Sequence, residues 1–408
     1  MEMVVAAHLK MPLAVLSSEP APAKDPSIRN HDVGAARGGS SRSGVGAERS
    51  LHGSLGAVLL ISRMHRVEKL NMRVCIIPAF RATGSITRVI SSVLPFVDRI
   101  IVVDDGCPDG TGDVAKAAFG DDTRVEIINA SVNRGVGGAM KLGIAVALSI
   151  GARLIVKVDA DDQMDARYIP DMFRILEANP KIALVKGNRF NDGAVVRVMP
   201  TARLVGNSIL TLLARISTGY WSGVDPTNGF IAIRASAIER IKIDQLSNRY
   251  YFEISLLAAL GLRRATIAEM EMPPIYGKFP SSLSLLRTIV TFPFHLTASL
   301  LKRIVWQYFV ADMNVGSLLM VVGALLWTFA AVLGSMWWSM ALHSGIPTTP
   351  GNASIVIAPL IMGSQLFLNA ILYDVQFSSR VLKIMREDLN ATIGFASSLQ
   401  PDGLSAVH

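Results

Sequence analysis

Cysteine is scarce in this chain of 408 residues, which contains only Cys75 and Cys107. Two cysteines cannot supply a disulfide framework, and they are too few for a zinc site built on cysteine. The simplest interpretation is a reduced, cytosol-facing catalytic part. The chain also lacks an internal repeat and a polar segment in which aromatic residues alternate with Lys and Arg. We therefore do not expect nucleic acid as a partner.

Apolar residues, in contrast, are abundant. They make up 50% of the chain, and the mean hydropathy is +0.40. This is more than a large core requires, and the surplus lies near the C-terminus. The formal net charge is +8 and the isoelectric point about 9.6. A basic chain of this kind favours an anionic partner, such as a membrane surface or a phosphorylated substrate.

The first 70 residues differ in composition from the rest. They are rich in Pro, Ala, Gly and Ser, and the plainest low-complexity piece reads GAARGGSSRSGVGAERS. Such a composition predicts a disordered leader. The apolar fragment 55–61 is too short to cross a bilayer and lacks the flanks of a signal peptide.

From Arg73 onward, short apolar runs alternate with amphipathic stretches. This rhythm predicts an α/β fold with a largely parallel sheet covered on both faces, whose ligands gather at the carboxyl ends of the strands. We expect strands at 73–79, 99–103, 124–128, 154–158, 182–186 and 263–270. We expect helices at 85–94, 111–119, 136–150 and 169–178.

An acidic cluster follows the predicted strand 154–158. Asp159 and Asp161 stand one residue apart at the strand end, and Gln163 follows two residues later. Carboxylate and amide oxygens are the hard ligands that Mg²⁺ or Mn²⁺ prefers, and such a site leaves positions for a diphosphate. The alternative is that these residues are solvated turn residues that cap the helix beginning near Tyr168.

The C-terminal third predicts attachment to a membrane. Residues 283–310 mix apolar, aromatic and basic residues, as helices in a membrane interface do. The runs 315–342 and 353–373 are long enough to cross a bilayer. Lys and Arg precede the first run and follow the second, whereas the loop between them has neither. The positive-inside rule then predicts a hairpin with both ends in the cytosol. Two buried helices of a soluble domain are the alternative.

Several motifs in one order resemble a known family. RVCIIPAFRATGSITRVISSVLPFVDRIIVVDDGCPDGT, NRGVGGAMKLGIAVAL and VDADDQMD resemble the family 2 glycosyltransferases with a GT-A fold. KGNRF, MPTARLVGN, GYWSGVDPTNGFIAI and RYYFE are similar to the branch that acts on dolichyl or undecaprenyl phosphate. The resemblance covers roughly residues 73–280, and members of that branch also carry two C-terminal membrane helices.

The resemblance implies roles at the donor. Asp159, Asp161 and Gln163 would hold a divalent cation that neutralises the diphosphate of a nucleotide sugar and stabilises its departure. The remaining implied donor-binding residues are Pro78, Ala79, Asp104, Asp105, Asn133, Arg134 and Gly135. The first two would form the nucleoside wall, the two aspartates would bind the nucleoside, and the last three would approach the donor at a helix N-terminus.

The resemblance also implies roles at the acceptor. Arg189 and Arg203 would bind the acceptor phosphate, which suits the two-pronged donor geometry of a guanidinium. Asp225 matches a carboxylate near the reacting centre and would act as a base or orient the acceptor, with Glu253 as a second catalytic candidate. Their alternatives are surface or capping arginines, a turn aspartate and a helix-start glutamate. A phosphate monoester with a second pKa of about 6 hardly needs a base.

Two stretches depart from the family pattern. Related sequences commonly continue the first motif with Tyr-Asn-Glu, whereas Phe80-Arg81-Ala82 stands here, so that nucleoside contact is lost or rebuilt. After Gly277, relatives commonly carry acidic residues or an arginine near the acceptor, whereas this chain has Lys278-Phe279-Pro280. These departures leave the identity of the acceptor and the level of activity open.

Three rival functions remain. A dinucleotide-binding dehydrogenase would use Gly135-Val136-Gly137 before a helix, but Met140 occupies the third glycine position. A processive polysaccharide synthase shares the GT-A core, but the nearest match to its Gln-x-x-Arg-Trp motif, at 245–250, has one residue too many and ends in Tyr. A degenerate membrane scaffold would bind a nucleotide sugar without turning it over.

We expect a multi-pass membrane protein, with its catalytic domain on the cytoplasmic face, that moves one sugar from a UDP- or GDP-activated donor to a polyprenyl phosphate. As the resemblance implies, the reaction inverts the anomeric centre. A homo-oligomer stays open. The predicted division of the chain is a leader at 1–70, a GT-A domain at 71–280, interface helices at 281–312, two transmembrane helices at 313–376 and a cytosolic tail at 377–408.

Overall fold

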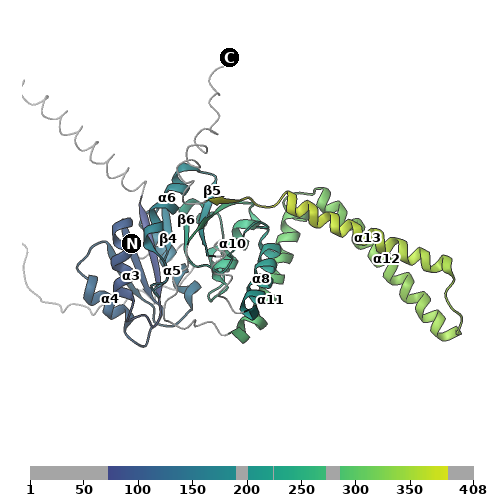
Figure 1. Ribbon diagram of the computed structural model, residues 1–408, viewed down its shortest axis with the longest axis horizontal. Coiled ribbons are helices and arrows are strands. Elements are labelled where there is room, and N and C mark those ends of the chain that lie inside the picture. The colour runs from purple at the N-terminus through teal and green to yellow at the C-terminus, as the bar shows by residue number, and fades with distance from the viewer. Residues whose placement is uncertain (1–71, 190–200, 224, 273–284, 385–408) are drawn as a thin grey trace, which may run out of the picture.

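The computed structural model describes residues 72–189, 201–223, 225–272 and 285–384, without the side chains of 201–204 and 285–291. It consists of an α/β body from which two long helices project (Figure 1). The strands are β1 (Arg73–Ala79), β2 (Arg99–Asp104), β3 (Val125–Asn129), β4 (Leu154–Lys157), β5 (Ile182–Asn188), β6 (Ile231–Arg234), β7 (Thr266–Glu271) and β8 (Val381–Ile384). The helices of the body are α3 (Ile86–Val93), α4 (Thr111–Phe119), α5 (Val136–Ser149), α6 (Ile169–Ala178), α8 (Thr201–Thr218), α9 (Ala235–Glu239) and α10 (Phe252–Leu262). Short 3-10 turns lie at Leu94–Phe96, Ala166–Tyr168 and Ile243–Gln245.

The eight strands form one sheet in the order β3-β2-β1-β4-β6-β5-β7-β8. Among the strands of the described residues, only β6 runs antiparallel to its neighbours, β4 and β5; the other pairings are parallel. The predicted mostly parallel sheet is therefore confirmed, and the antiparallel β6 is an addition to it. Because β6 is reversed, its first residue lies at the same sheet edge as the carboxyl ends of the parallel strands.

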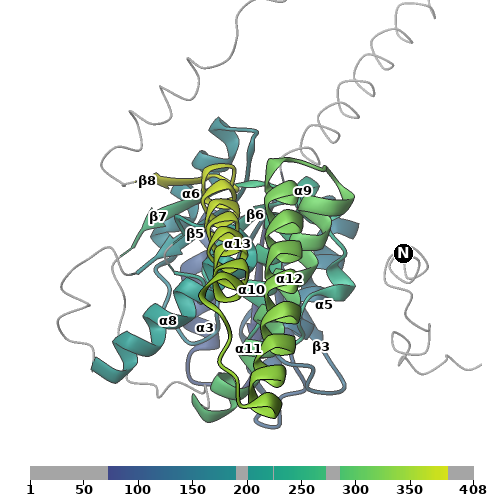
Figure 2. The ribbon, with the colours of Figure 1, turned by 90° about the vertical axis from the view of Figure 1, so that its right-hand side faces the viewer.

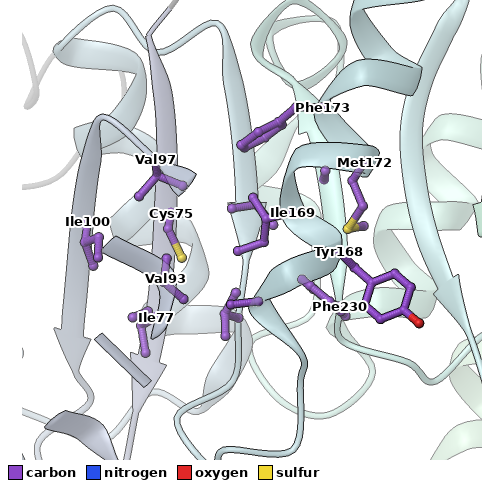
Figure 3. Close-up of a cluster of buried hydrophobic side chains, with 14 of the residues drawn as sticks. Cys75, Ile77, Val93, Val97, Ile100, Tyr168, Ile169, Met172, Phe173 and Phe230 are labelled. Carbon is purple, nitrogen blue, oxygen red and sulfur yellow. The ribbon is translucent and has the colours of Figure 1, made fainter. Parts of the chain in front are cut away.

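The apolar residues of β1 show why this sheet is covered on both sides. Cys75, Ile77 and Ala79 belong to one buried cluster, whereas Val74 and Ile76 belong to another. Successive strand residues point to opposite faces, so a continuous apolar run needs a helical layer on each face. Helices α3 and α6 cover the first face, whose core is drawn in Figure 3, and α5 and α10 cover the second.

The projecting arm is α12 (Val315–Ser344) and α13 (Pro350–Gln376), which pack together as a hairpin. Both helices are long and apolar enough to cross a membrane, and little of either is buried. Asn314 and Ser317 form a capping box that fixes the start of α12. The alternative of two buried core helices does not describe this arm.

Two further helices lie at the base of the hairpin. α11 (Leu285–Val305), which continues into a π-helical turn at Trp306–Val310, packs against α8. In Figures 1 and 2 both helices lie on the side of the body from which the hairpin leaves. Each exposes apolar side chains, among them Ile209 and Leu212 on α8 and Phe294 and Leu301 on α11. We expected interface helices only at 281–312, the region that contains α11. The exposed apolar side chains of α8 were not expected.

The chain returns to the sheet after the hairpin. Residues 381–384, which we assigned to the tail, form β8, with Ile267 opposite Val381 and Met270 opposite Ile384. Residues 385–408 of the expected tail and the whole of the expected leader lie outside the described residues. Both ends of the hairpin are thus fastened to the α/β body.

Candidate active site

Polar side chains converge at the carboxyl edge of the sheet. Asp104 ends β2, and Asp159 lies two residues beyond the end of β4. Arg189 directly follows β5, and Asp225 lies in the loop that leads into the reversed strand β6. The sheet therefore brings to one edge residues that are up to 121 positions apart in the sequence.

Asp159 is held by a lysine that the sequence analysis did not single out. Lys157, the last residue of β4, is fully buried, and its Nζ donates to Oδ1 of Asp159. The same Nζ lies 3.2 Å from Oε1 of Glu253 and 3.4 Å from the carbonyl oxygen of Gly229. Burial alone would lower the pKa of Lys157, but the charges of Asp159 and Glu253 raise it above its ordinary value. The two carboxylates therefore favour the charged form of this lysine.

Asp161 lies in the turn that follows. Its Oδ1 accepts the backbone N–H of Gln163 at 3.1 Å, and Asp162 adopts a left-handed φ of 61° between them. Desolvation, followed by the negative charge of Asp159, raises the pKa of Asp161. The two carboxylates are thus close enough to repel each other. The helix-capping alternative fits Asp165, whose side chain accepts the Arg167 N–H at the start of the next 3-10 turn.

The acid pair offers an incomplete ligand set for a cation. Within the described ranges, no group of three or more His, Cys, Asp or Glu side chains gathers as a metal cage. Mg²⁺ in nucleotide enzymes is often held by one or two carboxylates together with substrate phosphates. Two repelling carboxylates fit that use, because a bound cation relieves their repulsion.

Asp104 and Asp105 are engaged by backbone amides. Oδ1 of Asp104 accepts the Cys107 N–H at 2.8 Å, and Oδ2 accepts the Gly112 N–H at 2.6 Å. Asp105 accepts the N–H groups of Arg134 and Gly135 at 2.8 and 2.6 Å. Burial raises the pKa of Asp105, and these two amide bonds offset the rise only in part. In this geometry the aspartates shape the loops that surround the expected nucleoside site.

The loop of Asn133, Arg134 and Gly135 leads into α5 at the same edge. Gly135 has a φ of 85°, which favours glycine, and a side chain there would collide with the Asn248 carbonyl. The approach of this helix start to the donor stays a prediction; the amides of Arg134 and Gly135 just before the helix donate to Asp105. Pro78 and Ala79, the expected nucleoside wall, are the buried last residues of β1.

Arg189 and Asp225 form a further ion pair at this edge. Nε of Arg189 lies 2.8 Å from Oδ2 of Asp225, and Nη2 lies 3.2 Å from Oδ1. Asp225 is completely buried, whereas 42% of the Arg189 side chain is exposed. The buried carboxylate of Asp225 therefore holds the partly exposed guanidinium of Arg189 in place. Arg203 lies in the first turn of α8, and its side chain is outside the described residues.

Lys186 is a second buried lysine that the sequence analysis missed. It lies in β5, is fully buried, and donates to the carbonyl oxygen of Asn228. Burial lowers the pKa of Lys186 to about 8, against the opposing charges of Asp225, Glu253 and Glu269. The signal for both lysines is the same, since each interrupts an otherwise apolar strand. Glu253, our second catalytic candidate, is the second residue of α10; it pairs with Lys157, and its charge also acts on Lys186.

The comparisons with known proteins agree with the motifs. The model of the family described as glycosyl transferase family 2 matches residues 74–242. The undecaprenyl-phosphate mannosyltransferase of Micrococcus luteus is 32% identical over 194 residues, which is 46% of this chain and 78% of that protein. The UDP-N-acetylglucosamine–dolichyl-phosphate N-acetylglucosaminyltransferase of Methanococcus voltae is 27% identical over 220 residues, covering 50% of this chain and 86% of that protein.

A solved structure is also similar at a lower level. Glucosyl-3-phosphoglycerate synthase from Mycobacterium tuberculosis, in complex with Mn²⁺, UDP-glucose and phosphoglyceric acid, gives a TM-score of 0.44 at 21% identity. The match covers 60% of this chain and 83% of that one. The family model and the Micrococcus luteus relative confirm the resemblance drawn from the motifs, so the chain belongs to glycosyltransferase family 2.

Proposed function

We propose that this protein transfers one sugar from a nucleotide-sugar donor to a polyprenyl phosphate at a bilayer surface, with inversion of the anomeric centre. The observation that carries the proposal is the shared sheet edge, where the Asp159–Asp161 acid pair and the braced guanidinium of Arg189 both lie. The first suits a cation and diphosphate, and the second suits a phosphate. The named relatives act on undecaprenyl and dolichyl phosphates, which supports this acceptor class.

At the donor, Asp159 and Asp161 would hold Mg²⁺ or Mn²⁺, with Gln163 beside them. When bound, the cation supplies charge neutralisation for the departing diphosphate. Pro78, Ala79 and the loops shaped by Asp104 and Asp105 would enclose the nucleoside, as would Asn133, Arg134 and Gly135. The backbone amides of Arg134 and Gly135 donate to Asp105 and so hold this loop in place.

At the acceptor, Arg189 and Arg203 would bind the lipid phosphate. An oxygen of this phosphate attacks the anomeric carbon while the bond from that carbon to the diphosphate breaks. The phosphate dianion needs no base. Asp225, buried against Arg189, then serves to orient the arginine. Glu253, which pairs with Lys157, serves as a buried counterion.

The membrane anchor supports the lipid acceptor. Polyprenyl phosphate stays in the bilayer, so the enzyme must approach its surface. We propose that 71–280 is the catalytic domain, that 281–312 together with α8 lies in the interface, and that α12 and α13 span the bilayer. The absence of Lys and Arg from the loop 343–352 favours both hairpin ends, and hence the catalytic domain, on the cytoplasmic face. This orientation brings acceptor and donor together, which lowers the entropic barrier of the reaction.

The test is incubation of the purified full chain with a panel of radiolabelled UDP- and GDP-sugars and undecaprenyl phosphate, followed by lipid extraction. We expect a lipid that carries a single sugar, formed from one donor in the presence of Mg²⁺ or Mn²⁺. An Asp161→Asn variant is the matched blank. A long polymer would instead establish a processive synthase, and nucleotide-sugar binding without any product would establish a scaffold.

A further inference from the structure

The contact between Lys157 and Asp159 changes what the acid pair can do. Lys157 is fully buried, whereas 31% of the Asp159 side chain is exposed. One oxygen of Asp159 is therefore already bound to a cation that belongs to the protein. The other oxygen lies beside Gly229, where a Cβ would come within 2.6 Å of it.

Lys157 is held in this place from the other side as well. Glu253 at 3.2 Å and the Gly229 carbonyl oxygen at 3.4 Å fix its Nζ. A buried ammonium without partners is strongly unfavourable, so the lysine cannot turn away from both carboxylates. Asp159 can gain a second cation only where the Lys157 charge already repels it.

We propose that Lys157 makes cation binding depend on donor binding: it weakens the acid pair as a metal site, so that the ion is retained only when a nucleoside diphosphate adds negative charge and ligand oxygens. This inference rests on the proposed function and deepens it. The empty enzyme then binds Mg²⁺ or Mn²⁺ poorly, and the enzyme with nucleotide binds it well. Lys157 touches neither substrate and acts through Asp159 as a positioning residue.

The coupling has a thermodynamic consequence. If UDP or GDP tightens Mn²⁺ binding by some factor, Mn²⁺ tightens nucleotide binding by the same factor. Removal of the internal cation raises the affinity of the acid pair for Mn²⁺ both with and without nucleotide, so the nucleotide-free enzyme also retains the ion. A structural role of Lys157 alone predicts no such change in Mn²⁺ affinity.

The experiment measures Mn²⁺ binding by electron paramagnetic resonance on the full chain in detergent, with and without UDP or GDP. We compare the wild type with Lys157→Met and with Lys157→Met/Glu253→Gln, which removes the lysine together with its buried counterion and so avoids an unpaired charge at Glu253. Lys116→Met, an exposed lysine on α4, is the matched control. Asp161→Asn added to the double variant locates the ion at the acid pair.

We expect nucleotide to tighten Mn²⁺ binding by at least about tenfold in the wild type and in Lys116→Met. In the double variant, nucleotide-free binding tightens by a similar factor, so Mn²⁺ is retained without nucleotide, and Asp161→Asn abolishes the gain. Nucleotide-dependent Mn²⁺ binding that is identical in the wild type and the double variant overturns the role of Lys157 and leaves the proposed function standing. If neither the wild type nor any variant binds Mn²⁺ even with nucleotide, the role of a cation is refuted, both in the proposed function and in this inference.

Discussion

Two buried ion clusters, one at the sheet edge and one at the base of the hairpin, differ in how completely they are closed. At the sheet edge, Lys157 engages one oxygen of Asp159, whose side chain remains 31% exposed. At the base of the hairpin, Asp374 near the end of α13 accepts two hydrogen bonds from Arg303, one from Tyr308 and one from Trp221. The Arg303 side chain is 4% exposed and that of Asp374 11%.

The closed cluster has a structural role, whereas the open cluster can still bind a ligand. The closed cluster joins α11, its π-helical turn, α13 and the loop after α8, so it fastens the hairpin to the body. All strong acceptor positions of Asp374 are satisfied from within the protein. The open cluster keeps one carboxylate partly exposed beside a second acid, Asp161, and so retains capacity for a ligand. Breaking each cluster should therefore have different effects.

The largest effect is expected at the closed cluster. Arg303→Met leaves Asp374 buried without its main counterion, which costs about 3–5 kcal/mol of stability. This should lower the Tm of the full chain in detergent by about 10 °C. The double variant Arg303→Met/Asp374→Leu should recover much of the loss, because two apolar groups replace the pair.

Arg124→Met is the control for this experiment, since its ion pair with Asp122 lies on the surface and should change Tm little. Equal shifts in Tm for Arg303→Met and Arg124→Met would mean that the cluster at the hairpin base does not stabilise the attachment of the hairpin to the body.

The second prediction concerns the open cluster. Asp161→Asn should reduce kcat by about 10²–10³-fold, because neutralisation of the departing diphosphate is lost, while Tm stays close to that of the wild type. Steady-state kinetics with the labelled donor and thermal unfolding measure the two quantities. Asp121→Asn, an exposed aspartate before β3, should change neither. An Asp161→Asn variant with a clearly lowered Tm but an unchanged kcat would make this cluster structural like the other.

The fold of the closed region was less predictable than that of the open one. Alternating apolar runs predicted β1, β2 and β4, and two uninterrupted apolar runs predicted α12 and α13. β8 was missed because its four residues gain their order from pairing with β7, more than 100 positions earlier. The loop of Trp221 and the end of α13 are likewise brought together only by the tertiary structure.

The candidate site was predictable in its residue types but not in its contacts. The carboxylates after β4 could be found because strand ends meet at one edge. The second carboxylate that holds Lys157 is Glu253, which lies 96 positions away in the sequence. Likewise, the hydrogen bonds of Asp105 to Arg134 and Gly135 depend on the path of a loop, which no local pattern records.

The third prediction tests the acceptor side of the open region. Arg189→Lys keeps a positive charge beside the buried Asp225 but loses the two-pronged geometry. The KM for the lipid acceptor should rise by about tenfold, while the KM for the donor changes little. Arg124→Lys, far from this edge, should alter neither constant. A donor KM that rises more than the acceptor KM would assign Arg189 to the nucleotide sugar.

The smallest expected effect is a pH dependence that originates at Lys186. Burial lowers the folded-state pKa of this lysine to about 8, below its ordinary value of 10.5. Between these values the unfolded chain binds more protons than the folded one, so this lysine makes stability rise with pH, by at most about 1.4 kcal/mol per pH unit. Below pH 8 the lysine is charged in both states and the gain disappears. From pH 8 to pH 10, the Tm of the wild type should therefore rise relative to that of Lys186→Met. A Tm difference that does not depend on pH would show that Lys186 keeps its charge throughout this range.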